Sequence, residues 1–298
     1  MKLGMIGLGR MGAGMTERLR RHGHEVLGFD ARPDVSEVPT LAELVAALPA
    51  PRVAWVMVPS GEPTEATVQE LAGLLEPGDL VVDGGNSNYK DSIRRGRDLA
   101  ERDLGFVDAG VSGGVWGLKE GFCLMVGGEA DQVTRMQPVF DALAPHGGFV
   151  HAGPIGAGHF TKMVHNGIEY GLMHAYGEGY ELLRASELGI DVPAVVNAWG
   201  QGSVVRSWLL ELLALGLADD PDLDRIRGYA EDSGEGRWTV EEAVRLGVPA
   251  NVLATALFAR FTSRQDDSPA MKVVAVLRQQ FGGHAVKGSE GATPLIKE

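Results

Sequence analysis

A glycine-rich turn near the N-terminus constrains the fold of this chain more than any other feature. Gly7, Gly9 and Gly12 follow the apolar run Lys2–Ile6 and open a helical stretch. In such a strand–turn–helix unit, Gly7 permits the tight turn and Gly12 lets the helix pack closely on the strand, while Gly9 leaves room for a pyrophosphate. The free N–H groups of the helix N-terminus then face the phosphates. An incidental glycine turn is the alternative, but this context favours a dinucleotide-binding turn.

An acidic residue, Asp30, follows the second predicted strand, Glu25–Phe29. A carboxylate there can hydrogen-bond the adenosine ribose hydroxyls and would repel the 2′-phosphate of NADP, so it favours NAD. Arg32 could restore NADP binding, and Asp30 could instead simply begin the turn toward Pro33. The residues that we expect at the cofactor are Gly7, Leu8, Gly9, Arg10, Met11, Gly12, Asp30, Val58, Pro59 and Asn86.

Short β-branched runs alternate with helical stretches up to about residue 155, which predicts βα units and a parallel sheet. The predicted strands are Lys2–Ile6, Glu25–Phe29, Val53–Val58, Leu80–Val82, Gly105–Val111, Leu124–Val126 and Phe149–His151. After the break at Gly153–Gly158, helical periodicity continues to about Phe281. We therefore expect an α/β Rossmann-type domain over residues 1–157, an all-α substrate and dimerisation domain over 158–287 with a long interdomain helix, and a flexible tail over 288–298.

The composition limits the compartment and the class of partner. A chain of 298 residues that is 44% hydrophobic can bury a sizeable core, and its net charge of −13 is unfavourable for general nucleic-acid binding. Without a signal-peptide pattern or a membrane-spanning apolar run, the protein is expected in the cytoplasm. The one cysteine, Cys123, lies in the apolar run Phe122–Val126 and is predicted to be a buried, inert thiol. No metal site is predicted.

Five functional side chains fall on one stripe of a long predicted helix, His159–Glu187. They stand at i, i+3, i+4, i+7 and i+8, and they are Lys162, His165, Asn166, Glu169 and Tyr170. A solvated face would favour several Glu, Lys and Arg, whereas this stripe holds five different residue types. Gly167 and Gly171 each cost about 1 kcal/mol relative to alanine in a helix, which indicates close packing. The stripe is therefore interpreted as functional.

Lys162 and Glu169 form a candidate acid–base pair, provided that the site shifts their pKa values toward neutrality. Two loops should face the same helix, because ligands of open α/β sheets bind beyond the carboxyl ends of the strands. These loops are Asp83–Ser87 and Asp108–Gly114. The groups that could hold a carboxylate or hydroxyls there are Asn86, Ser112 and the amides of Gly113 and Gly114. Taken alone, either loop is merely a glycine turn.

Together these motifs resemble those of the decarboxylating 6-phosphogluconate dehydrogenases, a family of the 3-hydroxyacid dehydrogenase superfamily. The matching segments run in order along nearly the whole chain and are Gly7–Gly12, Gly84–Ser87, Val111–Gly114, Lys162–Tyr170, Gly236–Thr239, Phe258–Arg260 and Phe281–His284. The combination Lys-x-x-His-Asn-Gly-x-Glu-Tyr is the specific part, since sibling dehydrogenases share the lysine but usually continue differently.

The resemblance implies the oxidative decarboxylation of 6-phosphogluconate to ribulose 5-phosphate in the pentose phosphate pathway. A lysine like Lys162 would remove the proton of the 3-hydroxyl while hydride passes to the nicotinamide. A glutamic acid like Glu169 would then protonate the enediol after CO₂ leaves. The residues implied around the carboxylate and hydroxyls are Asn86, Ser112, Gly113, Gly114, His165 and Asn166, and those implied around the phosphate are Tyr170, Arg260, Arg278 and His284.

The chain departs from the long enzymes of this family in three ways. Its shorter helical region resembles the short form, and Arg278 with His284 would imply a homodimer or homotetramer if they act in a neighbouring subunit. Ser233 falls where the family carries a lysine near the phosphate, with Arg237 the nearest cation. Asp30 and Arg32 stand in place of the Asn-Arg-Thr-like turn of NADP-using members, consistent with NAD.

Two other functions stay open at this point. A related hydroxyacid dehydrogenase acting on a smaller, non-phosphorylated acid would share the fold and Lys162. It would not need Glu169, Tyr170 and the Arg278/His284 tail together. A non-catalytic dinucleotide sensor would lack a proton-transfer residue, whereas both candidates are present in this chain.

Overall fold

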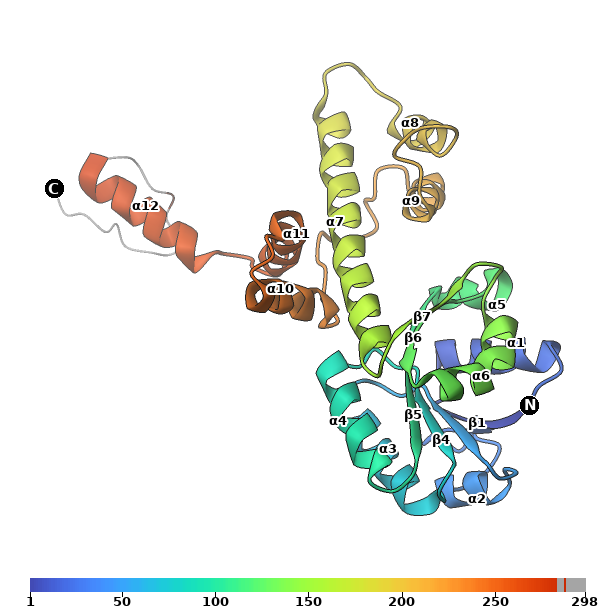
Figure 1. The fold of residues 1–298 in the computed structure, drawn as a ribbon. Helices are drawn as coiled ribbons and strands as arrows, with labels where there is room; N and C mark the ends of the chain where they lie inside the picture. The colour runs from blue at the N-terminus through green and yellow to red at the C-terminus, as the bar shows by residue number, and fades with distance from the viewer. Residues whose placement is uncertain (283–286, 288–298) are drawn as a thin grey trace. The chain divides into compact units, whose positions relative to one another are not determined.

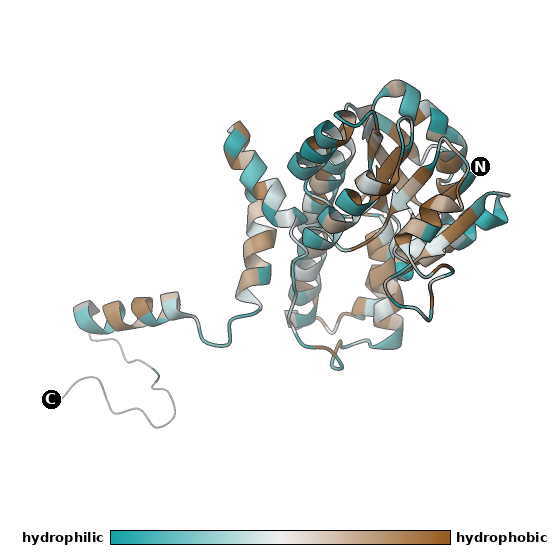
Figure 2. Ribbon diagram, turned by 90° about the horizontal axis from the view of Figure 1, so that it is seen from below, coloured by the Kyte–Doolittle hydropathy of each residue, from teal (hydrophilic) through white to brown (hydrophobic). Residues whose placement is uncertain are grey.

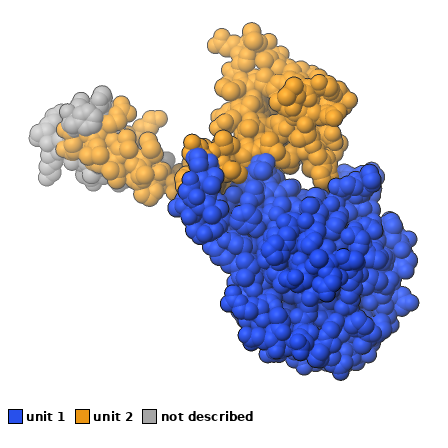
Figure 3. Space-filling view, viewed as in Figure 1, with its two compact units in different colours: residues 1–170, 234–250 blue, residues 171–233, 251–298 orange. Residues whose placement is uncertain are grey.

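The computed structural model describes residues 1–282 and residue 287, which form two compact units (Figure 3). The first unit contains residues 1–170 and 234–250, and the second contains the remaining described residues. The predicted tail, residues 288–298, lies outside the described residues. The domain division predicted at residue 157 stays a prediction. The compact units divide later, inside helix α7 (Ala157–Ala185), because the segment 234–250 packs with the first turns of that helix.

Within the described residues, seven strands form one sheet in the order β2-β1-β3-β4-β5-β6-β7 (Figure 1). The strands are β1 (Lys2–Ile6), β2 (Glu25–Phe29), β3 (Val53–Val56), β4 (Leu80–Asp83), β5 (Gly105–Ser112), β6 (Cys123–Gly128) and β7 (Phe149–Gly153). The Rossmann-type prediction is confirmed. Strand β1 lies between β2 and β3, so the chain leaves β1 toward one side of the sheet and later returns to its other side at β3. Such a reversal of strand order is a topological switch point, and ligands of α/β sheets bind at its carboxyl end, here the end of β1.

One strand corrects the prediction of a parallel sheet, because β6 pairs with β5 in the antiparallel direction. Only residues 113–122 join the two strands, through the 3₁₀ turn η1 (Gly114–Trp116) and the short helix α5 (Gly117–Glu120). A parallel pairing needs a crossover of a dozen residues or more, which this connection does not supply. The remaining neighbours pair in parallel.

The central strands are buried on both faces, as expected for a sheet covered by helices. Along β3, Val53 and Trp55 join one apolar cluster, and Ala54 and Val56 join the other. The helices around the sheet are α1 (Arg10–Arg21), α2 (Leu41–Ala46), α3 (Glu62–Leu74), α4 (Tyr89–Ala100) and α6 (Ala130–Leu143). Apolar residues of α1 and α6 pack in the first cluster and those of α2, α3 and α4 in the second. Figure 2 shows the hydrophobic strands between helices whose outer faces are hydrophilic.

The start of helix α2 has a local signal in the sequence. Thr40 caps the helix by accepting a hydrogen bond from the backbone N–H of Glu43 at 3.1 Å, and its hydroxyl also contacts the Glu43 carboxylate. The sequence Thr40-Leu-Ala-Glu43 has the pattern of a capping box, and the bond from the Glu43 N–H to the Thr40 hydroxyl is one half of that motif. The helix is only six residues long, so its apolar periodicity is weak.

The helices α8 (Val192–Trp199), α9 (Trp208–Asp219), α11 (Asn251–Thr262) and α12 (Pro269–Gly282), together with the second half of α7, belong to the second unit. A small core of Val192, Val196, Leu210 and Leu217 joins α8 to α9. Helix α9 begins at Trp208, because Ser207 caps it by accepting a hydrogen bond from the backbone N–H of Leu210. Among the described residues, no helix combines the length and the apolar character needed to cross a membrane.

Helix α10 (Glu235–Leu246) belongs to the first unit. Gly234 precedes it with φ of 102°, a conformation that favours glycine. A start at Glu235 places the segment Gly236–Thr239 in the first turns of a helix that packs on α7.

Candidate active site

The glycine turn has the geometry that a dinucleotide pyrophosphate needs. Gly7 adopts φ of 93°, and a side chain at Gly12 would place its Cβ 1.9 Å from the carbonyl oxygen of Gly7. Gly9, by contrast, is exposed, and a Cβ there would meet no atom within 4 Å. No side chain caps the N-terminus of α1. The residues therefore fit the cofactor, since two glycines close the turn and the third leaves open space beside free N–H groups.

Asp30 is fixed at the end of β2 beside this turn. Its carboxylate accepts a hydrogen bond from the backbone N–H of Leu8 at 2.7 Å. The Arg32 side chain donates to the same carboxylate at 3.0 Å and, with the backbone bonds from Arg32 and Leu8, lowers the pKa of Asp30 to about 2. Arg32 also reaches the carbonyl of Leu8. Asp30 is thus an oriented anion at the adenosine end of the predicted cofactor site.

The other predicted cofactor residues lie around the same carboxyl edge of the sheet. Val58 and Pro59 follow β3, and the hydroxyl of Thr64 donates to the carbonyl of Pro59 at 2.9 Å. Asn86 is exposed on the loop after β4. Arg10 is exposed and Met11 is partly buried at the start of α1.

A buried ionic network, not anticipated from the sequence, shapes the loop that carries Asn86. Asp83 is fully buried, accepts hydrogen bonds from the N–H of Gly85 and the hydroxyl of Ser87, and pairs with Arg95 at 3.2 Å. Arg95 in turn pairs with Glu65 at 2.9 Å. Only the acidic residue at the strand end hinted at this network, because Glu65 and Arg95 lie far apart in the sequence.

Asp108 fixes the start of α7 against β5. Its carboxylate accepts hydrogen bonds from the backbone N–H groups of Gly156 and His159 at 2.6 and 2.8 Å, as an anion at a helix N-terminus should. His159 is buried and bonds Ser92 of α4 at 2.7 Å. Gly110 then allows close approach, since a Cβ there would lie 2.4 Å from the Cβ of Lys162. Lys162 therefore packs directly against strand β5 of the sheet.

Lys162 is buried, with 6% of its surface exposed. Burial lowers the pKa of its ammonium group, and the acidic side chains of Glu169, Glu235 and Cys123 oppose that shift. No hydrogen bond or ion pair to the Lys162 ammonium occurs in the described part of the chain, which leaves the nitrogen available to a ligand. The predicted lowering of the Lys162 pKa is confirmed in direction.

Three more residues of the stripe contact one another beside Lys162. His165 lies 2.9 Å from the side-chain oxygen of Asn166, 3.4 Å from the hydroxyl of Ser112 and 3.8 Å from the Glu169 carboxylate. His165 and Glu169 each keep somewhat over a third of their side chain exposed, whereas Asn166 is 9% exposed. The structure thus brings together four predicted residues, one of them from the β5 loop with Gly113 and Gly114.

Tyr170 lies at the far end of the stripe and is buried against α10. A Cβ on Gly236 would lie 2.5 Å from its ring, so glycine is required there. Thr239, one turn further along α10, donates its hydroxyl proton to the carbonyl of Met163 at 2.8 Å. The segment Gly236–Thr239, which the sequence comparison singled out, therefore docks α10 on α7.

The other predicted phosphate ligands, Arg260, Arg278 and His284, do not lie on the polar stripe of α7. Arg260 lies on α11 in the second unit, where its guanidinium donates to the backbone carbonyl of Glu231 at 2.8 Å. Arg278 is exposed on α12. His284 lies outside the described residues. Their assignment to the substrate phosphate stays a prediction.

The expectation that Cys123 is buried is corrected. Cys123 is exposed rather than buried, because it is the first residue of β6 and precedes the buried residues 124–128. It lies opposite Ser112 in the β5–β6 register.

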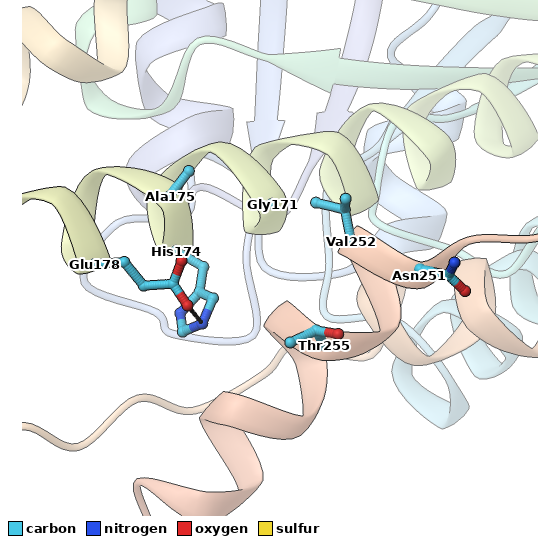
Figure 4. Close-up of a pocket in the computed structure, with 7 residues that line it drawn as sticks. All are labelled: Gly171, His174, Ala175, Glu178, Asn251, Val252 and Thr255. Carbon is cyan, nitrogen blue, oxygen red and sulfur yellow. Dashed lines mark ion pairs between the residues drawn. The ribbon is translucent and has the colours of Figure 1, made fainter.

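A pocket of about 250 Å³ in the second unit contains none of the predicted site residues (Figure 4). It is lined by Gly171, His174, Ala175, Glu178, Asn251, Val252 and Thr255. His174 and Glu178 pair there at 3.2 Å, one turn apart on α7. Asn251 and Thr255 add two neutral polar side chains, and the pocket holds neither of the proposed acid–base residues, Lys162 and Glu169.

Comparison with known proteins agrees with this geometry. The chain matches the family model of the NAD binding domain of 6-phosphogluconate dehydrogenase over residues 2–153, and that of the C-terminal domain of the same enzyme over residues 158–290. It is 43% identical over 296 residues to a Bacillus subtilis protein provisionally named as a 6-phosphogluconate dehydrogenase, covering 96% of this chain and 99% of that protein.

Two further relatives carry definite names. A Haloferax volcanii NAD(+)-dependent, decarboxylating 6-phosphogluconate dehydrogenase is 41% identical over 297 residues, covering 96% of this chain and 98% of that protein. Among solved structures, 6-phosphogluconate dehydrogenase of Plasmodium falciparum superposes with a TM-score of 0.82 at 27% identity, covering 98% of this chain and 67% of that one. That protein was determined with NADP+ and with 6-phosphogluconate.

The sheet with its glycine turn and the polar stripe of α7 define a Rossmann-type, dinucleotide-binding dehydrogenase. The family models and the relatives that match nearly the whole chain narrow this class of dehydrogenase to one family. The chain belongs to the 6-phosphogluconate dehydrogenase family.

Proposed function

We propose that this chain catalyses the oxidative decarboxylation of 6-phosphogluconate to ribulose 5-phosphate and CO₂ with reduction of a nicotinamide dinucleotide, preferably NAD. The observation that carries the proposal is a buried lysine with no partner among the described residues. It lies on the same helix face as His165, Asn166 and Glu169. The cytoplasmic location expected from the sequence is part of the same proposal.

The glycine turn and Asp30 would hold the cofactor, which when bound accepts a hydride from the carbon that carries the 3-hydroxyl. Asp30 supports the preference for NAD. Arg32 already pairs with the Asp30 carboxylate, so its charge is engaged and a 2′-phosphate placed there would meet the Asp30 carboxylate without a free cation from Arg32.

Lys162 is the proposed general base, because burial lowers its pKa and so raises the neutral fraction of its amine. Its nitrogen takes the proton of the 3-hydroxyl as that group becomes a ketone. The resulting 3-keto acid breaks its C1–C2 bond, and the electron pair moves toward the ketone oxygen as CO₂ leaves. Lys162 returns its proton to that oxygen, which gives the enediol.

Glu169 is the proposed acid of the last step. It stands seven residues after Lys162 on α7, about 10 Å along the helix axis. Its protonated carboxyl donates to the former C2 carbon, while Lys162 takes back the hydroxyl proton as the ketone of ribulose 5-phosphate forms. Exchange with solvent then restores both groups, in keeping with the partial exposure of Glu169.

The remaining predicted residues would position the substrate. Asn86, Ser112, Gly113, Gly114, His165 and Asn166 would bind the carboxylate and hydroxyls. Tyr170, Arg260, Arg278 and His284 would surround the phosphate, the last two from a second subunit of a homodimer or homotetramer. Ser233 in the usual lysine position predicts a weaker phosphate contact than in the long enzymes.

The test is a set of initial rates with 6-phosphogluconate and with a smaller, non-phosphorylated 3-hydroxy acid, each with NAD and with NADP. We expect kcat/KM to be highest for 6-phosphogluconate with NAD. No dinucleotide reduction at millimolar 6-phosphogluconate, or faster turnover of the smaller acid, would reject the proposed function. Faster turnover with NADP would reject only the cofactor preference.

A further inference from the structure

A second carboxylate, Glu235, lies beside the polar stripe of α7, although no sequence motif pointed to it. It is 2% exposed, and its side chain accepts a hydrogen bond from the Asn166 amide nitrogen at 3.2 Å. Thr239 stands one turn later on α10 and bonds the carbonyl of Met163. Glu235 and Thr239 therefore present one face of α10 to the turn of α7 that contains Lys162 and Asn166.

The burial of Glu235 needs an explanation, because a carboxylate without water is costly unless other groups compensate its charge. Part of the compensation is local, since Glu235 is the first residue of α10, where the helix dipole favours an anion. A neutral glutamine could make the same hydrogen bond to Asn166 with less desolvation. Glu235 thus brings to this turn of α7 a negative charge that the hydrogen bond to Asn166 does not by itself require.

We propose that Glu235 is a positioning residue of the active site, which orients the Asn166 amide and supplies a fixed negative charge to the lysine one helical turn away. This inference rests on the proposed function. Three acidic groups on the elements around Lys162 raise its pKa, namely Glu169 of α7, Glu235 of α10 and Cys123 of β6. Glu169 changes its protonation in the proposed reaction and is partly solvated, whereas Glu235 is shielded and exchanges no proton with the substrate.

The charge of Glu235 has a defined consequence for Lys162. Burial lowers the pKa of the lysine, and the carboxylates of Glu169 and Glu235 raise it. Removing the charge of Glu235 lets the pKa of Lys162 fall further, so the base stays neutral to lower pH. The acidic limb of the kcat/KM profile, which reports the base of the free enzyme, should then move to lower pH.

Two substitutions separate the two parts of the proposal. Glu235→Gln keeps an oxygen that can accept from Asn166 but removes the charge. We expect it to move the acidic limb down by roughly one pH unit with KM for 6-phosphogluconate near that of the wild type. Glu235→Asp keeps the charge but shortens the side chain. It should leave the limb in place and raise KM several-fold by releasing Asn166.

Glu242→Gln is the matched control, because Glu242 lies on the same helix, is 3% exposed and pairs with Arg245 and Lys90 rather than with α7. Its acidic limb should coincide with that of the wild type. An unchanged limb in Glu235→Gln, or an equal shift in Glu242→Gln, would overturn the proposal.

A second readout does not depend on turnover. The pH titration of Lys162 can be followed by NMR after ¹³C-methylation of the lysines, with Lys162→Arg used to assign the signal. We expect the pKa of Lys162 to be lower in Glu235→Gln than in the wild type and unchanged in Glu242→Gln. If the wild type does not turn over 6-phosphogluconate, the proposed function fails while this titration still tests the charge. Equal titrations in the wild type and Glu235→Gln would reject the role of Glu235.

Discussion

The cofactor turn and the polar stripe of α7 are built in opposite ways. In the turn, the backbone of one continuous segment forms the site, and glycines are needed because side chains would fill the space. In the stripe, side chains form the site, and groups from β5, α4 and α10 hold them in place. Local sequence therefore determines the first region, whereas tertiary packing determines the second. Substitutions should divide accordingly between cofactor affinity and turnover.

The largest expected effect is that of Lys162→Ala. Loss of the general base should lower kcat by about 10²- to 10⁴-fold. The dissociation constant of NAD, measured by fluorescence titration, should stay near the wild-type value because the glycine turn is untouched. Wild-type turnover in this variant would remove Lys162 from the mechanism, and a matching loss of NAD affinity would show that the two regions are not separable.

Gly110→Ala tests whether packing positions the lysine. Its Cβ would lie 2.4 Å from the Cβ of Lys162, so the lysine must move. A displacement of about 1 Å in a reacting group can lower turnover roughly 100-fold. Gly23→Ala offers a control for the general effect of a glycine substitution, since a Cβ there has free space although its φ of 81° is strained. Comparable kcat losses in both variants would mean that Gly110 acts only through stability.

Gly9→Ala addresses the cofactor turn alone. The added methyl group meets no protein atom, so the thermal unfolding midpoint should change little. It occupies the space left for the pyrophosphate, however, and disrupting one hydrogen-bonded phosphate contact should weaken NAD binding roughly 10-fold. An unaltered NAD affinity would place the pyrophosphate elsewhere. Gly12→Ala, whose Cβ would overlap the Gly7 carbonyl, should instead lower the unfolding midpoint.

The smallest effect is expected for Asp30→Ala. Loss of one charge-assisted hydrogen bond to the ribose should weaken NAD about 10-fold or less and reduce the discrimination against NADP. In the wild type, NAD affinity should be independent of pH between 5 and 8 as far as Asp30 is concerned. Its pKa of about 2 keeps it ionised there, and its contribution should be lost only as the pH falls toward that value. Unchanged affinities for both dinucleotides in the variant would make Asp30 a turn residue only.

The two regions also differ in how far the sequence predicted them. Gly7, Gly9 and Gly12 could be assigned separate roles because each acts on the backbone within a few residues. The apolar runs predicted the strands, and the helical spacing of the polar residues predicted the stripe of α7. Residues joined only by folding could not be found in this way, as Glu235 shows, since it lies 69 residues from Asn166.

Other errors have equally specific causes. The antiparallel direction of β6 follows from the short connection before it, whereas the apolar runs predict only where the strands lie and not their direction. Cys123 was expected to be buried from its neighbours, yet a strand's first residue can be exposed. The start of α10 cannot be read from apolar periodicity, because Gly234, Glu235 and Gly236 lack an apolar period although they begin the helix that docks on α7.

The most direct test of the whole account is the fate of the carboxyl carbon. With 6-phosphogluconate labelled with ¹⁴C at C1, the wild-type protein should release one labelled CO₂ for each dinucleotide reduced, with ribulose 5-phosphate as the other product. Dinucleotide reduction without release of labelled CO₂ would contradict the account, because Lys162 and Glu169 would then serve a simple alcohol oxidation.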